Sequence, residues 1–235
     1  MPESAKRPRL EELKLQELLA YKTLKMLHRT ERHGYPEALS LRVHRALSWL
    51  QRSEQETVDS DARFLFLWIS FNAAYARELD ERRGFSERRL LFRYVNRLIK
   101  ADDQSLIYHA VWHSYSESIR LLLDNEFVFQ PYWDYQNGRI SEDRWRDSFR
   151  LSKVAVVKAL GRMDTKKVLA IVIDRLYTLR NQLVHGGSTW NSSVSRKQVK
   201  EGASILGLLV PLMIYLMMRS PDQPWGEPCY PVVQG

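Results

Sequence analysis

Residues 64–76 (FLFLWISFNAAYA) form a run that is apolar on nearly all sides when it is drawn as a helix. A surface helix needs only one apolar stripe, whereas a helix that is apolar all round is stable when other elements surround it. The run lies within a longer helical pattern, residues 59–83, which ends at Gly84. The sequence therefore predicts a bundle with this helix at its centre.

A second apolar run, residues 203–218 (ASILGLLVPLMIYLMM), has to be considered as a membrane span. It is shorter than the roughly 20 residues that a spanning helix needs. It also contains Pro211, and charged residues bound it, Lys200 and Glu201 before it and Arg219 after it. We interpret it as a buried core or interface helix of a protein without a membrane partner. Peripheral association with a membrane is the weaker alternative.

Helical periodicity extends over most of the chain. The further predicted helices cover residues 10–27, 36–56, 87–100, 104–125, 142–160, 165–185 and 196–219. The sequence contains no internal repeat and no convincing pair of strands. The predicted fold is therefore all-α: a single helical bundle over residues 36–220, with an N-terminal helical extension over residues 1–35 and a Pro-rich, irregular tail over residues 221–235.

Residues 127–139 (FVFQPYWDYQNGR) differ from the rest of the chain because they are rich in aromatic side chains. The segment contains Pro131 and ends in Asn137–Gly138, a strong turn signal. We predict an ordered loop inserted in the bundle. Its rings can stack on nucleobases, but packing of a long loop against helices is the commoner explanation.

The charge balance of the chain is basic, with 36 Lys and Arg against 28 Asp and Glu and a formal net charge of +8. Such a balance favours nucleic acid or an acidic partner, although the same charges can lie on solvated helix faces beside glutamates. The single cysteine, Cys229, excludes an internal disulfide scaffold. It favours a reducing compartment, so we expect a cytoplasmic protein.

No metal or cofactor is expected from the sequence. It has no Cys/His group with zinc-ligand spacing, and it lacks a Gly-rich phosphate loop, a nucleophile elbow and the H-E-x-x-H motif.

The best candidate for catalysis is a polar group at the end of one strongly predicted helix, formed by Arg180, Asn181 and His185. Gly186–Gly187 follow as the predicted cap of that helix. A guanidinium can stabilise the extra negative charge of a pentacoordinate phosphate, and an imidazole can transfer protons near neutral pH. The alternative is structural: His185 caps the last carbonyls, and Arg180 pairs with Asp174 or a neighbour.

Three further residues are candidates for binding substrate, and each has a structural alternative. Asn72 is a polar residue inside the apolar run, so it lines the cleft or bonds to a neighbouring helix. Trp190 follows the candidate group and can stack on a base, but the link that carries it also caps the final helix. Arg196 opens that final helix and can contribute phosphate charge or remain solvated.

The stretch over residues 175–199, RLYTLRNQLVHGGSTWNSSVSRKQV, resembles the signature of the HEPN superfamily. Members of this superfamily are helical bundles with an R-x4-6-H motif, often with a polar residue after the Arg. Arg180, Asn181 and His185 occupy those positions. The run over residues 64–76 is similar to a helix found in many bacterial HEPN proteins of the Apea-like kind. The resemblance covers about residues 36–220.

The resemblance implies a metal-independent endoribonuclease that forms a homodimer, with two Arg/His pairs facing one another across a composite cleft. His185 would then transfer a proton around the 2′-hydroxyl, Arg180 would bind the scissile phosphate, and Asn181 would hold substrate or orient the pair. The expected products carry a 2′,3′-cyclic phosphate and a 5′-hydroxyl. The substrate must be RNA because DNA lacks the 2′-hydroxyl.

Proteins of this superfamily act as toxins, in antiviral defence and in RNA processing, and some have an antitoxin or another regulatory protein as partner. One subgroup carries a tyrosine two residues after the His, which a partner nucleotidyltransferase modifies, whereas this chain has Gly187 there. Other members are inactive and serve as interaction or nucleic-acid-binding modules. An inactive module is the alternative to the nuclease.

Overall fold

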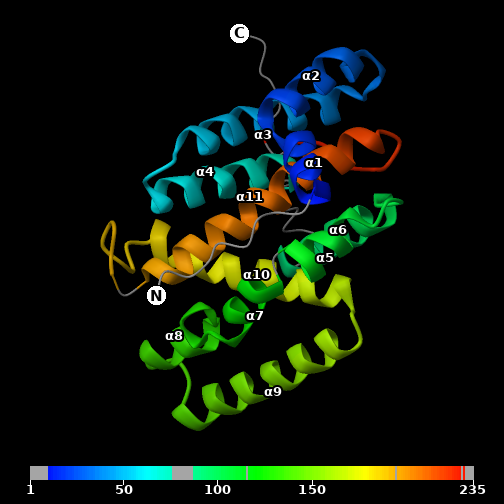
Figure 1. Ribbon diagram of the computed structural model, residues 1–235. Coiled ribbons are helices and arrows are strands. Elements are labelled where there is room, and N and C mark those ends of the chain that lie inside the picture. The colour runs from blue at the N-terminus through cyan, green and yellow to red at the C-terminus, as the bar shows by residue number, and fades with distance from the viewer. Residues whose placement is uncertain (1–9, 76–86, 115, 194, 229, 231–235) are drawn as a thin grey trace.

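The computed structural model describes residues 10–75, 87–114, 116–193, 195–228 and 230, and within these ranges it contains helices and no strand (Figure 1). The predicted all-α class is therefore confirmed. The helices are α1 (Leu10–Leu19), α2 (Tyr21–Glu31), α3 (Glu37–Gln55), α4 (Ser60–Tyr75), α5 (Glu87–Ala101), α6 (Leu106–His109), α7 (Ser116–Asp124), α8 (Gln130–Gln136), α9 (Glu142–Gly161), α10 (Thr165–Val184) and α11 (Arg196–Arg219). Short turns η1 (Arg32–Gly34), η3 (Ala110–Ser114) and η4 (Glu126–Val128) connect some of them.

Helices α4 and α11 form the centre of the bundle. In Figure 1, α11 lies between the α3–α4 pair and α10, and α9 forms the outer edge of the molecule. Phe64, Leu67 and Phe71 of α4 are all at most 1% exposed, which confirms the central position predicted for this helix. The enclosure is incomplete, because Ile69 on its outer side is 37% exposed.

Helix α11 is long and apolar enough to cross a membrane by length and composition, and 78% of its most apolar window is buried inside the protein. That burial agrees with the prediction of a core helix. Gly202 explains how closely α11 approaches its neighbours. A Cβ atom added there would lie 2.9 Å from side-chain carbons of both Leu179 and Phe64. The missing side chain therefore allows α4, α10 and α11 to meet.

The two N-terminal helices pack on the bundle and contribute to its core. They correct the single helix predicted over residues 10–27, because Ala20 has an extended backbone that separates α1 from α2. Leu19 and Leu24 are buried with the residues of the core. At the other end of the sequence, Arg219 Nη1 of α11 lies 3.0 Å from Glu31 Oε1 of α2. The helices that precede α3 and the last helix are thus in direct contact.

The tail after α11 is irregular as predicted, and its described part packs against the bundle. Trp225 is 4% exposed, and its ring lies 6.0 Å from that of Tyr94. The guanidinium of Arg42, on α3, donates hydrogen bonds to the carbonyl oxygens of Gly226 and Glu227. Cys229, residues 231–235 and the predicted helical segment 76–83 lie outside the described residues.

The structure corrects the predicted loop over residues 127–139. The segment forms the turn η4 and then a short helix, α8, with Pro131 in its first turn. A proline is tolerated there because the first N–H groups of a helix have no partner within the helix. The proline therefore lies in the first turn of a helix, although its presence in this segment was taken to predict a loop.

The structure also corrects the single helix predicted over residues 104–125. It finds α6, the π-helical turn η3 and α7 in its place. Ser105 has a left-handed backbone, with φ of 57°. The carboxylate of Asp102 accepts hydrogen bonds from the N–H groups of Leu106 and Ile107. These bonds cap the N-terminus of α6, so α6 begins as a separate helix.

Burial of His28 makes the stability of the bundle depend on pH. The side chain is 1% exposed, and its Nε2 lies 3.2 Å from Ser40 Oγ. Desolvation, followed by the charges of Lys25 and His44, lowers its pKa to about 4 from a usual value of about 6.5. The stability that neutral His28 contributes is therefore complete above about pH 6.5 and is lost as the pH falls toward 4.

We expect the free energy of unfolding to fall by about 2 kcal/mol between pH 7 and pH 4.5 because of His28. Urea unfolding at several pH values measures this change. The variant His28→Leu should have a flatter profile in that window, whereas His33→Leu, at an exposed position in η1, should keep the wild-type slope. Equal slopes in all three proteins would contradict the assignment.

Candidate functional site

The candidate site lies at the C-terminal end of α10, which two glycines close. Gly186 has a φ of +69°, in the left-handed region that favours glycine. Its N–H donates to the carbonyl of Leu183, and the N–H of Gly187 donates to the carbonyl of Gln182 at 2.7 Å. This pair of bonds is a Schellman cap. The predicted cap is therefore confirmed, and it fixes the direction in which the chain leaves the helix.

Arg180 and Asn181 are half-buried and directly bonded to each other, because Arg180 Nη1 donates to Asn181 Oδ1 at 2.9 Å. Arg180 Nε is buried and has no acceptor among the described residues. From the sequence, the expected partner of Arg180 was Asp174 or a neighbouring residue. The structure provides the neighbour, a neutral carboxamide, so the positive charge of Arg180 is not neutralised by this bond.

His185 is exposed and follows the last residue of α10. Its backbone N–H donates to the carbonyl of Asn181 at 3.0 Å, so it lies one turn beyond that residue. Four residues correspond to about 6 Å along a helix axis. Its imidazole has no hydrogen-bond partner in the described part of the chain, so the side chain is free to meet a ligand from solvent. The capping role that we considered for His185 is filled by its backbone N–H, not by its imidazole.

A cavity of about 280 Å³ opens beside Asn181. Its deep wall is buried, formed in part by Trp68 and Phe71, each at most 4% exposed. Its rim contains half-buried side chains that solvent can reach. The lining consists of four aromatic, two aliphatic and four polar residues: Trp68, Phe71, Tyr75, Tyr177, Leu91, Ile173, Gln130, Asp174, Thr178 and Asn181.

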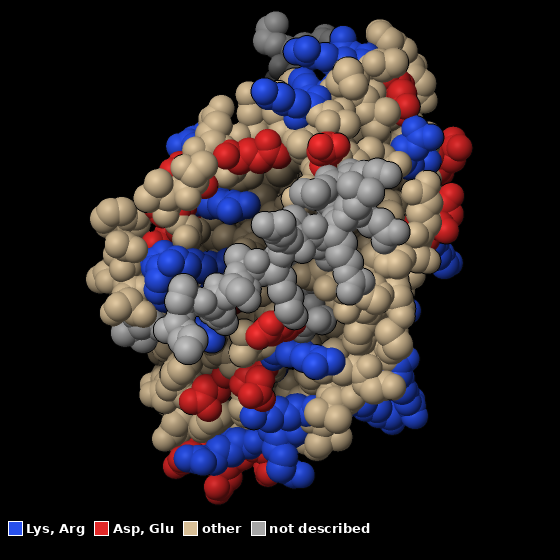
Figure 2. Space-filling model, in the orientation of Figure 1, with Lys and Arg blue, Asp and Glu red and all other residues tan. Residues whose placement is uncertain are grey.

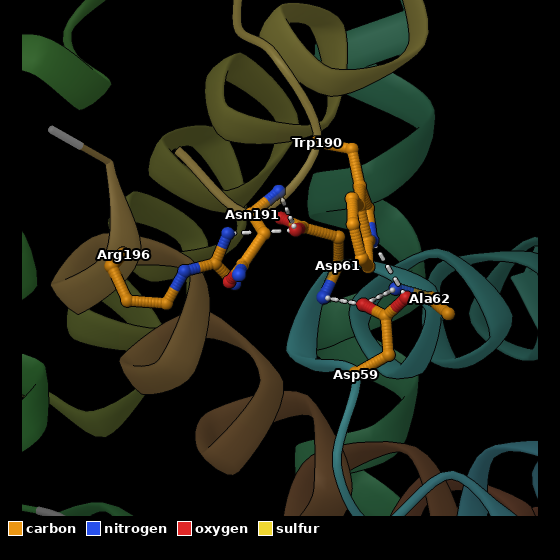
Figure 3. Close-up of polar contacts among 6 residues, drawn as sticks. All are labelled: Asp59, Asp61, Ala62, Trp190, Asn191 and Arg196. Carbon is orange, nitrogen blue, oxygen red and sulfur yellow. Dashed lines mark hydrogen bonds and ion pairs between the residues drawn. The ribbon is translucent and has the colours of Figure 1, made fainter. Parts of the chain in front are cut away.

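The link that follows the glycines is bound to the start of α4 by two carboxylates (Figure 3). Asp61 Oδ2 accepts from the backbone N–H of Asn191 at 2.9 Å and from Arg196 Nη2 at 2.7 Å. Asp59 Oδ2 accepts from Trp190 Nε1 at 2.8 Å, while its Oδ1 accepts from the N–H groups of Asp61 and Ala62. The contacts hold the link at residues 190–196, which begins five residues after His185.

Asp59 is also the N-terminal cap of α4, and its pKa is lowered mainly by the backbone hydrogen bond from Ala62. A carboxylate that accepts two backbone N–H bonds is stabilised in its charged form. The pair that Asp59 makes with Trp190 is therefore maintained well below neutral pH.

These contacts involve two of the residues that were predicted to bind substrate, Trp190 and Arg196. Trp190 is 74% exposed, so its ring remains available for stacking although its N–H is bonded. Arg196 has a side chain only 18% exposed and paired with Asp61, so little of its charge is left for a phosphate. Asn72 lies half-buried on α4, and no hydrogen bond joins it to Arg180 or His185 within the described residues.

Sequence reasoning missed both aspartates. Asp59 carries a usable signal, because an aspartate directly before a helix is a typical N-cap. Asp61 carries none, since its partner Arg196 is 135 residues away in the chain. Sequence reasoning also missed the contact of the aromatic segment with the site, where Gln182 of α10 donates a hydrogen bond to the carbonyl of Phe127.

Loss of Asp61 should destabilise the protein, because it would leave Arg196 largely buried without its partner. We expect Asp61→Ala to lower the free energy of unfolding by about 2–4 kcal/mol. Urea unfolding measures the effect. The control Asp147→Ala removes an ion pair with Arg150 whose side chains are both 69% exposed, and it should change stability by less than about 0.5 kcal/mol. Equal effects of the two variants would contradict the buried role of Asp61.

The surface charges do not indicate a single path for nucleic acid on the face drawn in Figure 2. Lys and Arg lie there in separate groups, with Asp and Glu between them. Among the described residues, no group of three or more His, Cys, Asp or Glu side chains is placed to hold a metal ion.

Comparison of the chain with protein-family models, with curated proteins and with solved structures finds no match. The resemblance to the HEPN superfamily therefore depends on the residues at the end of α10 and on the apolar run of α4 alone.

Proposed function

We propose that the protein is a metal-independent endoribonuclease of the HEPN type. The observation that supports this most is the arrangement at the end of α10. There an exposed imidazole, His185, lies one turn beyond a bonded guanidinium–carboxamide pair, Arg180 and Asn181. These groups supply a proton-transfer residue and a phosphate-binding cation without any metal.

Arg180 binds the scissile phosphate and stabilises the pentacoordinate state. Of its guanidinium nitrogens, Nη1 has a hydrogen-bond partner within the described residues, and that partner is the uncharged Asn181. An arginine fork suits two phosphate oxygens. Asn181 orients the guanidinium through the same bond.

His185 transfers the protons of the reaction. The 2′-oxygen attacks the phosphorus, its proton passes to an imidazole, and a bond forms that closes the 2′,3′-cyclic phosphate. The bond from phosphorus to the 5′-oxygen breaks, and that oxygen takes a proton to become a hydroxyl. We place the two proton transfers on the two copies of His185 in a homodimer, one accepting and one donating, with both Arg180 side chains at the same cleft.

The test is incubation of the purified protein with mixed cellular RNA in the presence of EDTA. We expect cleavage that leaves 2′,3′-cyclic phosphate and 5′-hydroxyl ends. DNA of the same length and RNA with 2′-deoxy substitutions should stay intact because they lack the attacking hydroxyl. Intact RNA after prolonged incubation, or cleavage only when a divalent metal is added, would refute the proposal.

An inactive interaction module is the second candidate function. The outer face of α9 supports it, because Leu151, Val154 and Val157 are apolar and each at least 58% exposed. Exposed apolar patches mark sites of protein association. RNA that stays intact, together with saturable binding of a protein or nucleic acid that survives His185→Ala, would favour this module over the nuclease. The cellular role in a toxin or antiviral defence system, with an antitoxin or regulator as partner, is part of the nuclease proposal.

A further inference from the structure

We infer that the cavity beside Asn181 is a binding pocket for a single nucleobase of the RNA substrate. The inference deepens the proposed function, on which it rests, because it names what the site holds next to the scissile phosphate. Four kinds of observation support it: the size of the cavity, its aromatic walls, the fixed direction of its polar groups and its position relative to the candidate reaction centre.

The size of the cavity fits one small planar ligand. Its volume is about 280 Å³, just below the range of about 300–1,000 Å³ that is typical for drug-sized ligands. Trp68, Phe71, Ile173 and Thr178 form a floor in which each residue is at most 4% exposed. The half-buried residues around it leave an opening, so a base can enter while its sugar and phosphate remain outside.

The walls of the cavity contain two pairs of aromatic rings in contact. Phe71 and Tyr75 are stacked, with ring centres 5.0 Å apart and planes within 17° of one another. Trp68 and Tyr177 meet edge to face at 5.9 Å. Stacking on aromatic side chains is the main way in which proteins bind unpaired bases, and every base has a face suited to it.

The hydrogen bonds that Asn181 and Gln130 make within the protein determine which of their side-chain atoms remain free as donor and acceptor. Asn181 must accept from Arg180 through Oδ1, because a guanidinium has no acceptor, so its Nδ2 is left as a donor. Gln130 donates through Nε2 to a carboxylate oxygen of Asp134 at 3.1 Å, so its Oε1 is left as an acceptor. One donor and one acceptor at the rim match the edge of a base, which carries both kinds of group.

The pocket adjoins the candidate reaction centre at Asn181, which lines the cavity and accepts a hydrogen bond from Arg180. Asp174, Thr178, Asn181 and His185 recur at spacings of three and four residues, so they lie along one side of α10. The first three line the cavity, and His185 lies one turn beyond its rim. A base held in the pocket would therefore place its own sugar and phosphate beside Arg180 and His185.

Ligand-observed NMR titration of the full chain tests the pocket without any cleavage step. The probes are the four ribonucleoside 5′-monophosphates, and ribose 5-phosphate is the matched ligand that lacks a base. We expect saturable binding of at least one nucleotide and none of ribose 5-phosphate. Equal binding of ribose 5-phosphate, or no binding of any nucleotide at millimolar concentration, would overturn the inference.

Two variants change the pocket in different ways. Gln130→Leu removes the acceptor and should weaken nucleotide binding by about tenfold, as expected for the loss of one hydrogen bond. Leu91→Phe fills part of the cavity and should weaken nucleotide binding by at least the same factor. Gln136→Leu, at an exposed position at the end of the same helix, is the control and should bind as wild type does. Circular dichroism checks that each variant is folded.

The two proposals fail in distinguishable ways. If RNA is cut in EDTA while nucleotides do not bind and Gln130→Leu cuts at the same positions as wild type, the pocket inference is wrong and the nuclease stands. If nucleotides bind as expected while RNA stays intact, the pocket inference is supported and the nuclease is wrong. A changed base preference at the cleavage site in Gln130→Leu would support both.

Discussion

Replacing His185 with alanine is expected to lower the rate of RNA cleavage by about 100-fold or more, since proton transfer by a positioned side chain contributes about 10²–10⁴-fold. The side chain is exposed and has no hydrogen-bond partner within the described residues, so the fold does not depend on it. The melting temperature should therefore stay close to that of the wild type. The measurement is the initial rate of cleavage of a labelled RNA in EDTA, beside a thermal melt of the same sample.

Arg180→Ala should cause a loss of similar size, because it removes the cation that stabilises the transition state. The matched control for His185 is His33→Ala, which removes another exposed imidazole in the turn η1. That variant should cleave as wild type does. Cleavage at wild-type rates in both the His185 and the Arg180 variants would remove the nuclease proposal.

The fold could be predicted from the sequence wherever the pattern of apolar residues was regular. The predicted range of α11, residues 196–219, agrees with the structure at both ends, and α10 ends one residue before the predicted limit. The apolar run of α4 indicated the centre of the bundle. In α4 and α11 a long run of apolar residues indicated a buried helix, and in α10 apolar residues at helical spacing indicated the helix.

The predictions failed where single side chains decided the local structure. Pro131 lies in the first turn of α8, where a loop was predicted, and Asp102 caps the N-terminus of α6, where a continuous helix was predicted. The bond that Trp112 Nε1 of η3 donates to Thr165 Oγ1 of α10 joins positions 53 residues apart. A contact of that kind has no signal in a local window.

The candidate site shows the same division between local and distant features. Arg180, Asn181 and His185 are near in sequence, so their closeness and the glycine cap could be predicted from helix geometry alone. The bonds from Asp59 and Asp61 to the following link, and the aromatic cavity beside Asn181, are built from several helices. Their existence depends on how α4, α8 and α10 pack, which the sequence pattern does not specify.

The second large effect concerns Arg42, whose guanidinium is 0% exposed and joins three parts of the molecule. It extends from α3, donates to the carbonyl of Ala74 near the end of α4 at 3.1 Å, and donates to the carbonyls of Gly226 and Glu227 in the tail. We expect Arg42→Ala to lower the free energy of unfolding by about 3 kcal/mol or more, because buried carbonyls lose their donors and a cavity is left. Arg42→Lys should recover little, because an ammonium cannot reach several acceptors with a rigid fork.

Urea unfolding measures the loss, and Arg150→Ala is the control, since its side chain is 69% exposed and its removal should cost less than about 0.5 kcal/mol. A double-mutant cycle with Trp225→Ala tests the reason for the loss. If Arg42 stabilises the bundle by holding the tail, the side chain of Trp225 depends on it, and the double variant should lose less than the sum of the two single losses. Strictly additive losses would show that Arg42 does not stabilise the bundle by holding the tail, and that the tail contributes its buried tryptophan independently.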